Sequence, residues 1–337
     1  MKLSGFEPDD ELADPILDPA LPIIDAHHHL WPSGAHIPYD LADFGEDLAS
    51  GHNIVGTVFV ECMTGYRQDG EAALRPVGET EFAVGEAGGV HGVAAGIVGY
   101  ADLTDPRVAA RTLDGHIAAG QGRFSGVRHN VVWHEREELI GARRRPPGLL
   151  LEPAFRESLA EVARRGLTYD VWLFHGQLAE LAATADALPE LVIIANHMGG
   201  PVTHLATPGG RAEVFGPWRE ALIDLARRPN VRLKLGGMGM TNYAFGFEQR
   251  PTRPTSAELA AAWEPYIDVA VNAFGADRCM FESNFPVDKQ SFSYRALWNA
   301  FKRLAAACSI DEKASLFSET ARRVYKIDKI SSPAGAL

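Results

Sequence analysis

Cysteine is scarce in this chain of 337 residues, and its few positions exclude several kinds of site. The sequence holds Cys62, Cys279 and Cys308, which are widely scattered and form no C-x-x-C pair. This number and spacing argue against a disulfide framework and a thiolate zinc site, and they favour a reducing compartment. We therefore expect a cytoplasmic protein.

Long apolar runs and an excess of basic charge are also lacking. No apolar stretch reaches the roughly 18 residues that span a bilayer, and the acidic, proline-containing start does not resemble a signal peptide. Lys and Arg number 32 against 44 Asp and Glu, which gives a net charge of −12. Because an acidic surface repels phosphate backbones and anionic lipids, we expect neither nucleic acid nor a membrane as a partner.

No glycine-rich phosphate motif follows any candidate strand, which weakens the alternative of an open, doubly wound sheet. Short β-branched or aliphatic runs instead alternate with longer, alanine-rich segments of helical period. Eight such runs of nearly continuous apolar character predict a closed parallel sheet, the (β/α)8 TIM barrel, in a single domain. The strands are expected at 22–27, 54–61, 90–98, 126–131, 167–173, 191–195, 231–235 and 278–282, and helices at 153–165, 177–187, 217–227 and 256–274.

The barrel is expected to occupy residues 21–330, after an N-terminal extension (1–20) and before a frayed tail (331–337). Barrels of this kind often form homodimers. Two loops are unusually long, 133–152 after strand four and 237–255 after strand seven, and such loops are typical of lids or binding segments. The first of these loops contains an arginine run at 143–145, which is expected to be solvated, with capture of an anionic substrate as the alternative. Three aromatic loop residues are expected to contact the substrate, with plain packing as the alternative: Tyr66, Trp133 and Tyr243.

Histidines stand at the ends of three expected strands, where barrel enzymes carry their chemistry. His27 and His29 share one face of the first strand by alternation, and two imidazoles at this spacing suit one divalent metal. A cluster of ordinary surface histidines is an alternative of about equal weight. His175 and His197 follow strands five and six, and barrel closure would bring all four histidines together.

Strand eight places a carboxylate beside the expected site. By alternation Met280, Glu282 and Asn284 share a face, so Glu282 is expected in the barrel interior one layer below Asn284. A buried carboxylate there needs a metal, a histidine or an arginine as its partner. The alternative is an outward Glu282 in a surface salt bridge.

Two strands carry basic residues that need an explanation. Arg128 and His129 follow strand four and are expected to contact substrate, because an arginine there suits a carboxylate or a polarised carbonyl. The alternative for Arg128 is an ion pair with an inward carboxylate such as Glu61. Lys234 is a rare charge in a buried strand, and an outward orientation is slightly favoured.

Taken together, these motifs resemble the amidohydrolase-related, metal-dependent TIM-barrel hydrolases, in particular the branch of 2-pyrone-4,6-dicarboxylate lactonase and the sugar lactonases. The resemblance runs from about Pro22 to Tyr325. It implies a pocket around the four histidines, a divalent metal, with zinc the first choice, at His27, His29 and His197, and opening of a lactone of a carboxylated or polyhydroxy molecule by activated water. The motifs that carry it are IDAHHHLW, GVRHN, FHGQL, NHMGGP, LKLGGMGM and FESNFPVD.

One position departs from the family pattern. Asn284 stands where the family usually has an aspartate, and an amide cannot take up a proton at neutral pH. Asp288, or with slightly less weight Glu282, is therefore expected to act as the base, with His175 and His197 beside it. Metal occupancy stays open, because members of this branch show weak or absent metal dependence. Two other functions also stay open: decarboxylation of an aromatic or muconate-type acid, and a catalytically silent barrel with a binding role.

Overall fold

The computed structural model describes residues 14–327 apart from 36, 88–89, 91, 141–144 and 205–208. The expectations for residues 1–13, for the arginines at 143 and 144 and for the tail 331–337 lie outside the described residues. Among the described residues, no helix combines the length and the apolar character that a membrane crossing requires.

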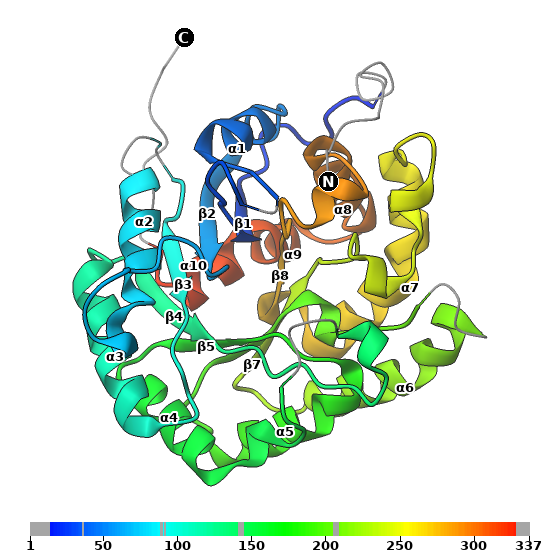
Figure 1. The fold of residues 1–337 in the computed structure, drawn as a ribbon. Helices are drawn as coiled ribbons and strands as arrows, with labels where there is room; N and C mark the ends of the chain where they lie inside the picture. The colour runs from blue at the N-terminus through cyan, green and yellow to red at the C-terminus, as the bar shows by residue number, and fades with distance from the viewer. Residues whose placement is uncertain are drawn as a thin grey trace.

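Eight parallel strands follow one another around a barrel in sequence order, which confirms the expected (β/α)8 fold (Figure 1). Backbone hydrogen bonds close the ring between the last and first strands: Asn284 N donates to His27 O at 2.9 Å and His29 N to Phe285 O at 2.8 Å. The strands are β1 (Ile23–His28), β2 (Ile54–Val60), β3 (Gly96–Gly99), β4 (Phe124–Arg128), β5 (Thr168–Val171), β6 (Ile193–Ala195), β7 (Val231–Leu235) and β8 (Cys279–Phe281).

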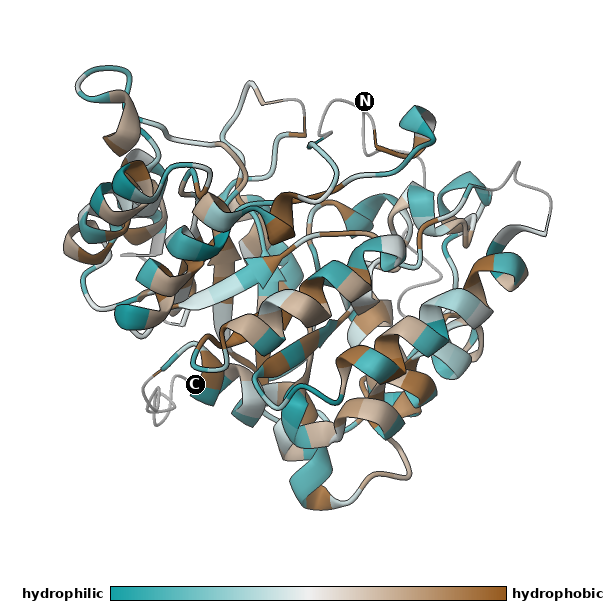
Figure 2. Cartoon of the chain, turned by 90° about the horizontal axis from the view of Figure 1, so that it is seen from below, coloured by the Kyte–Doolittle hydropathy of each residue, from teal (hydrophilic) through white to brown (hydrophobic). Residues whose placement is uncertain are grey.

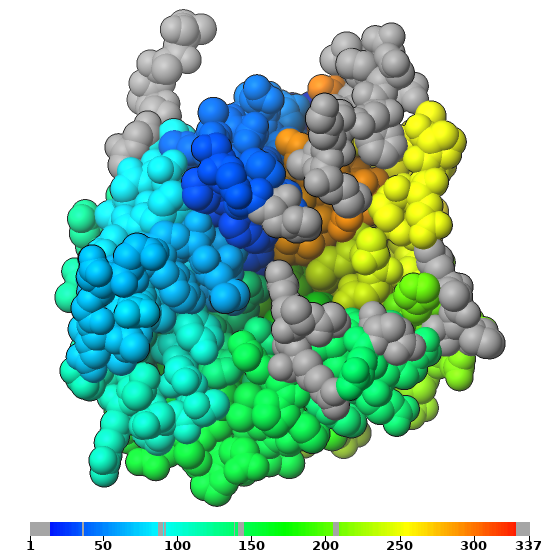
Figure 3. All heavy atoms as spheres, viewed as in Figure 1, coloured from blue at the N-terminus to red at the C-terminus, as the bar shows by residue number. Residues whose placement is uncertain are grey.

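Helices surround this ring. In the space-filling view the blue segment around α1 lies against the orange segment of α8, so the first and last units of the barrel are neighbours (Figure 3). Hydrophobic and hydrophilic residues alternate along the helices (Figure 2), and the buried apolar ones pack with those of the strands in one core cluster. The helices are α1 (Leu41–Leu48), α2 (Val77–Ala87), α3 (Pro106–Ala119), α4 (Pro153–Arg164), α5 (Leu178–Ala187), α6 (Gly210–Leu225), α7 (Ser256–Phe274), α8 (Tyr294–Leu304), α9 (Ile310–Ala314) and α10 (Thr320–Val324).

The two largest differences between the expected and the observed element boundaries have local reasons. β3 begins at Gly96 rather than at residue 90, because residues 92–95 form a turn before the strand. α6 begins at Gly210 rather than at 217, because Pro217, which resembles a helix start in the sequence, lies inside the helix. By contrast α7 has its expected bounds, since Thr255 caps it and Glu258 completes a capping box.

The barrel interior is apolar at one end and polar at the other. A small cluster fills the end into which the chain's last described residues insert, and its members include Ile24, Val58, Ile194, Met280 and Tyr325. Above this plug the inward positions carry charged and imidazole side chains. The polar end lies at the carboxyl ends of the strands, which is the catalytic end of such barrels.

An irregularity in β1 decides which histidines face inward. Ile24 and Ala26 belong to the interior cluster, so strict alternation would turn His28 inward next. The pairing register between β1 and β2 shifts between Asp25 and His28, and His28 instead stacks on Phe44 at a ring distance of 4.3 Å. The bulge therefore directs His27 and His29 inward.

Lys234 points into the barrel, and the outward orientation expected for it is wrong. Its Nζ lies 2.8 Å from Asp170 Oδ2, and both side chains are fully buried. Asp170 also accepts hydrogen bonds from Tyr325 Oη at 2.9 Å and from Asn196 Nδ2 at 2.9 Å. The inward lysine is tolerated because a carboxylate on β5, which strand order places two strands away, compensates its charge.

We expect Lys234→Met to lower the free energy of unfolding by about 3–5 kcal/mol, because it leaves the Asp170 carboxylate buried without its cation. Urea denaturation of the single variant and of Lys234→Met combined with Asp170→Asn measures the coupling. The double variant should lose less than the sum of the two single variants. Additive losses would show that the two side chains do not stabilise one another.

Candidate active site

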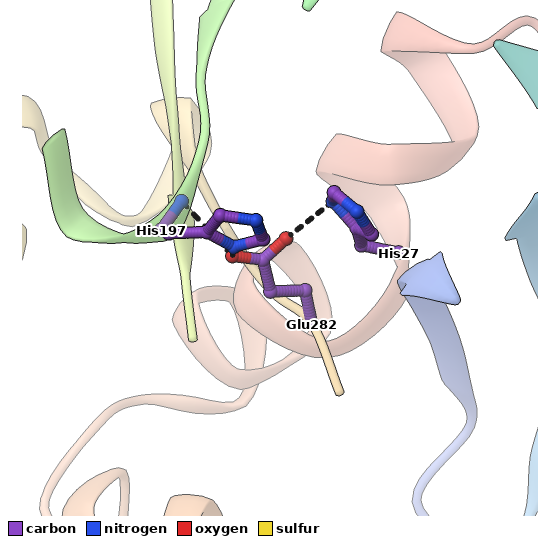
Figure 4. Close-up of side chains that lie close together, drawn as sticks. All are labelled: His27, His197 and Glu282. Carbon is purple, nitrogen blue, oxygen red and sulfur yellow. Dashed lines mark hydrogen bonds and ion pairs between the residues drawn. The ribbon is translucent and has the colours of Figure 1, made fainter. Parts of the chain in front are cut away.

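A carboxylate joins two imidazoles at the polar end of the barrel (Figure 4). Glu282 follows β8, and its Oε1 accepts from His197 Nδ1 at 2.7 Å and from His197 N at 3.0 Å. Its Oε2 lies 2.9 Å from Nδ1 of His27. All three side chains are buried, and their ligand atoms lie within 4.8 Å of one another. One carboxylate thus orients imidazoles from β1 and from the turn after β6.

His29 completes the group from the other side. Its Nδ1 lies 2.7 Å from the carbonyl oxygen of Val60, so this nitrogen must carry the proton, and its Nε2 lies 3.2 Å from His27 Nε2. Burial lowers the pKa of His27, His29 and His197, which keeps the imidazoles neutral at pH 7. The Nε2 atom of His29 therefore carries a lone pair, and it faces Nε2 of His27.

This pair fits a divalent metal. Two nitrogen ligands at about 2.0–2.1 Å from a tetrahedral zinc are about 3.3 Å apart, close to the observed 3.2 Å. Nδ1 of His29 has its proton on the carbonyl oxygen of Val60, the arrangement that holds histidine ligands in place at metal centres. Nδ1 of His27 lies 2.9 Å from Glu282 Oε2 and 3.3 Å from Lys234 Nζ. The imidazoles of His27, His29 and His197, with the Glu282 carboxylate beside them, are thus suited to a divalent cation.

Arg128 is both an ion-pair partner and a member of this group. Its Nε donates to Glu61 Oε1 at 2.7 Å, so the ion pair considered for it is present. Its Nη1 lies 3.2 Å from Nε2 of His27. The guanidinium therefore approaches the same lone pair that a metal would use.

A cavity of about 240 Å³ opens above these residues. Trp172, Met240 and Val287 line both this cavity and an adjoining one of about 570 Å³. The polar residues that line the cavity of about 240 Å³ are His29, Glu61, Arg128, Asn130, Arg145, His197 and Asn284.

The backbone is strained at two of these positions. His197 and Asn284 have φ values of 51° and 55°, in the left-handed region that side chains other than glycine rarely adopt. Such strain concentrates at functional sites, where the surrounding structure enforces it. Both residues line the cavity.

Asp288, the expected base, is not among the residues that line the cavity. It is 1% exposed, and its two oxygens accept from Gly239 N at 2.9 Å and from Asn284 Nδ2 at 2.8 Å. Burial raises the pKa of Asp288 well above its usual value. It is placed to connect the loop after β7 with the one after β8.

Two expected histidines lie outside the cluster. His175 begins a short turn after β5, and its N and Nδ1 both face the carbonyl oxygen of Gly200. His129 follows the inward Arg128 and so points outward, where its ring packs between Tyr100 and Phe155 and its Nδ1 accepts from Leu103 N. Neither lines the cavity, which corrects the expected convergence of four histidines and the expected contact of His129 with substrate.

The expected aromatic contacts are also displaced. Tyr243 is buried, stacks on Trp172 and donates from Oη to His197 O, so it supports the site from behind. Tyr66 and Trp133 are not among the residues that line either cavity near the cluster. Trp172 lines both cavities instead, with its ring 4.8 Å from that of His197. Alternation from the inward Asp170 gives Trp172 the same face, a signal present in the sequence.

An eight-stranded α/β barrel with imidazoles and a carboxylate converging at the carboxyl ends of its strands is the architecture of hydrolases that activate water. Comparison of sequences leads to the same class. The chain belongs to the amidohydrolase family, whose sequence model matches residues 24–327, and it is a hydrolase of that superfamily.

Three known proteins illustrate the relationship. An uncharacterized protein, y4mH, from Sinorhizobium fredii is 35% identical over 90% of this chain and 98% of its own length. An L-fucono-1,5-lactonase from Burkholderia ambifaria is 26% identical over 91% of this chain and 97% of its own. A crystal structure of an amidohydrolase from Burkholderia multivorans with bound zinc has a TM-score of 0.69 at 25% identity, covering 90% and 99% of the two chains.

A second buried carboxylate supports the loop after β2. Oε1 of Glu79 accepts from Cys62 N at 2.8 Å and from Thr64 N at 2.9 Å. Burial and the neighbouring charge of Glu61 raise the pKa of Glu79 to about 8. The carboxyl group therefore holds a proton in the folded protein at neutral pH.

The raised pKa predicts a pH-dependent stability. Between its usual value of about 4.3 and the folded value of about 8, Glu79 is protonated when folded and ionised when unfolded, so stability falls as pH rises through that window. Glu79→Gln keeps an acceptor for both N–H groups without titrating. Urea denaturation from pH 5 to 9 should show a smaller loss in the variant than in the wild type. Parallel profiles would contradict the protonated state of Glu79.

Proposed function

We propose that the protein hydrolyses a lactone of a small polyhydroxy or carboxylated acid. The observation that carries the proposal is the Glu282 carboxylate, which orients the imidazoles of His27 and His197 below a cavity with polar walls. An L-fucono-1,5-lactonase among the relatives supports the substrate class. A lactone ring is small enough for a cavity of about 240 Å³.

In this proposal His197 accepts the proton of the attacking water. Glu282 holds the Nδ1 proton of His197, so Nε2 is left with the lone pair that general-base catalysis requires. The water oxygen bonds to the lactone carbonyl carbon, the ring C–O bond then breaks, and the proton passes to the leaving ring oxygen. The product is an open hydroxy acid.

Arg128 stabilises the charge that develops on the carbonyl oxygen. Its guanidinium lies at the cavity floor, held by Glu61, so it is oriented before substrate arrives. Asn284 lines the same cavity and offers an amide for a hydroxyl or carbonyl of the substrate. Asn284 is itself held by Asp288, to which its Nδ2 donates.

His27 and His29, beside His197, would hold a divalent ion, with zinc the first choice. Such an ion, when bound, would polarise the lactone carbonyl as a Lewis acid and would lower the pKa of a water molecule. Glu282 then acts through Nδ1 of the imidazoles rather than as a ligand.

Two assays side by side test the lactone proposal against the decarboxylase alternative. A pH-indicator assay on a panel that includes L-fucono-1,5-lactone should record acid release above the spontaneous rate. Carbon dioxide release from hydroxybenzoates, measured on the same preparation, should stay at background. The reverse result would establish the decarboxylase, and no turnover in either assay would favour a binding role.

Two matched variants separate the roles of the buried carboxylates. Glu282→Gln should lower kcat by about 10²–10⁴-fold, because one amide cannot accept from both Nδ1 protons and the imidazoles lose their orientation. Asp288→Asn is the control, since it also removes a buried carboxyl group while keeping its shape. We expect it to lower kcat less than about 10-fold, because the amide of Asn284 can rotate to restore a hydrogen bond.

Thermal unfolding and zinc content of both variants accompany the kinetics. A selective loss in Asp288→Asn, with Glu282→Gln fully active, would make Asp288 the base and contradict the assignment. Loss of activity together with loss of fold in Glu282→Gln would be recognised by its thermal unfolding, and Glu282→Asp then gives the kinetic answer.

A further inference from the structure

The cavity above the cluster carries one positive charge more than its own residues compensate. Its charged lining residues are Glu61, Arg128 and Arg145, and its imidazoles are neutral. Glu61 forms an ion pair with Arg128. Among the residues that line the cavity, Arg145 is therefore the charge without an opposite partner, in a protein whose net charge is −12.

Arg145 comes from the long loop after β4, and a hydrogen bond within that loop holds its backbone. Its N donates to Val132 O at 3.0 Å. Its Nε is buried and has no hydrogen-bond partner among residues 14–327 as far as they are described. The expectation that the arginine run is solvated thus does not hold for Arg145.

Asp102, whose carboxylate interacts with Arg145 through their charges, does not pair with this guanidinium. Hydrogen bonds from Thr104 and the charges of His129 and Arg145 outweigh burial and lower the pKa of Asp102, so Asp102 is ionised. Its Oδ1 accepts from both N and Oγ1 of Thr104, and no ion pair joins it to Arg145. The Asp102 side chain is 47% exposed, so it lies toward solvent.

A buried donor without a partner costs free energy that a ligand can recover. Leaving such a group unpaired is unfavourable by more than an ordinary hydrogen bond, above all when the group is charged. A guanidinium pairs best with a carboxylate, which accepts two parallel hydrogen bonds. Binding energy for an anionic group is therefore available at the cavity wall.

We propose that Arg145 binds a carboxylate of the substrate, so that the preferred substrate is a lactone of a dicarboxylic sugar acid rather than a neutral sugar lactone. This inference rests on the proposed lactone hydrolysis and narrows its substrate class. Arg128 polarises the reacting carbonyl at the floor while Arg145 holds the far carboxylate at the wall.

The test compares two lactones that differ in one group. D-Glucono-1,4-lactone and D-glucaro-1,4-lactone share their ring, and the second carries a carboxylate in place of the terminal hydroxymethyl group. The wild type should hydrolyse the glucarolactone at least 10-fold more efficiently. Arg145→Gln should lower kcat/KM for the glucarolactone by about 10- to 100-fold and for the gluconolactone less than about 3-fold.

Arg227→Gln is the matched control, because it removes one positive charge from an arginine that is 76% exposed. It should leave both rates unchanged. An equal effect of Arg145→Gln on both lactones, or a wild type that prefers the neutral lactone, would overturn the inference while leaving lactone hydrolysis intact.

Calorimetric titration with D-glucarate, the open dicarboxylate, keeps the inference testable if neither lactone is hydrolysed. Binding by the wild type that Arg145→Gln abolishes and Arg227→Gln preserves would support the carboxylate site and leave only the proposed reaction wrong. No binding by the wild type, or equal binding by all three proteins, would overturn the inference.

Discussion

The buried carboxylate of Glu282 is the constraint on which the rest of the site depends. It has no exposure to solvent, so it must find its partners inside the barrel. It finds them in Nδ1 of His27 on β1 and in both N and Nδ1 of His197 after β6. These contacts fix the orientation of two imidazoles, and through them the side of each ring that carries a lone pair.

Two glycines that directly follow β7 allow Glu282 and His197 to pack this closely. A Cβ on Gly236 would lie 2.4 Å from Cγ of Glu282, and one on Gly237 would lie 2.7 Å from the ring of His197. The LKLGGMGM motif thus serves close packing against the cluster as well as a turn. The same reasoning explains how a carboxylate can stand at 282: its neighbour on β7 has no side chain to exclude it.

Alternation along strands explains which parts of the site could be predicted from the sequence. It gives Glu282 below Asn284, because the alternation of β8 continues past its last residue, and it gives Arg128 an inward direction at the end of β4. It does not reveal the bulge in β1, and it gives no orientation for Lys234, since the compensating Asp170 lies on another strand. Pairings across the barrel exist only once closure brings distant strands together.

Loop residues escape prediction for a different reason. Asp288 and Arg145 lie beyond their strands, where no period determines the direction of a side chain. Their positions depend on a few hydrogen bonds outside the strand pairing: Asp288 accepts from Gly239 N and from Asn284 Nδ2, and Arg145 N donates to Val132 O. A sequence can therefore name the charged residues of such loops without showing which one turns inward.

At the barrel floor, the Arg128 guanidinium and a divalent metal ion would occupy neighbouring positions beside the same imidazole. Glu61 compensates Arg128 and Asp170 compensates Lys234, whereas the contacts of Glu282 at bonding distance are imidazoles whose neutral state leaves its charge unbalanced. That excess favours a cation near the imidazoles. Nη1 of Arg128 lies 3.2 Å from Nε2 of His27, the nitrogen that would bind a metal. The positive charge of Arg128 therefore repels a dication at this position, whereas the negative charge of Glu282 attracts it. The metal affinity of this site is consequently the difference between an attractive and a repulsive electrostatic contribution. Asn284 carries no charge where the family usually has a carboxylate, so it does not increase the attraction.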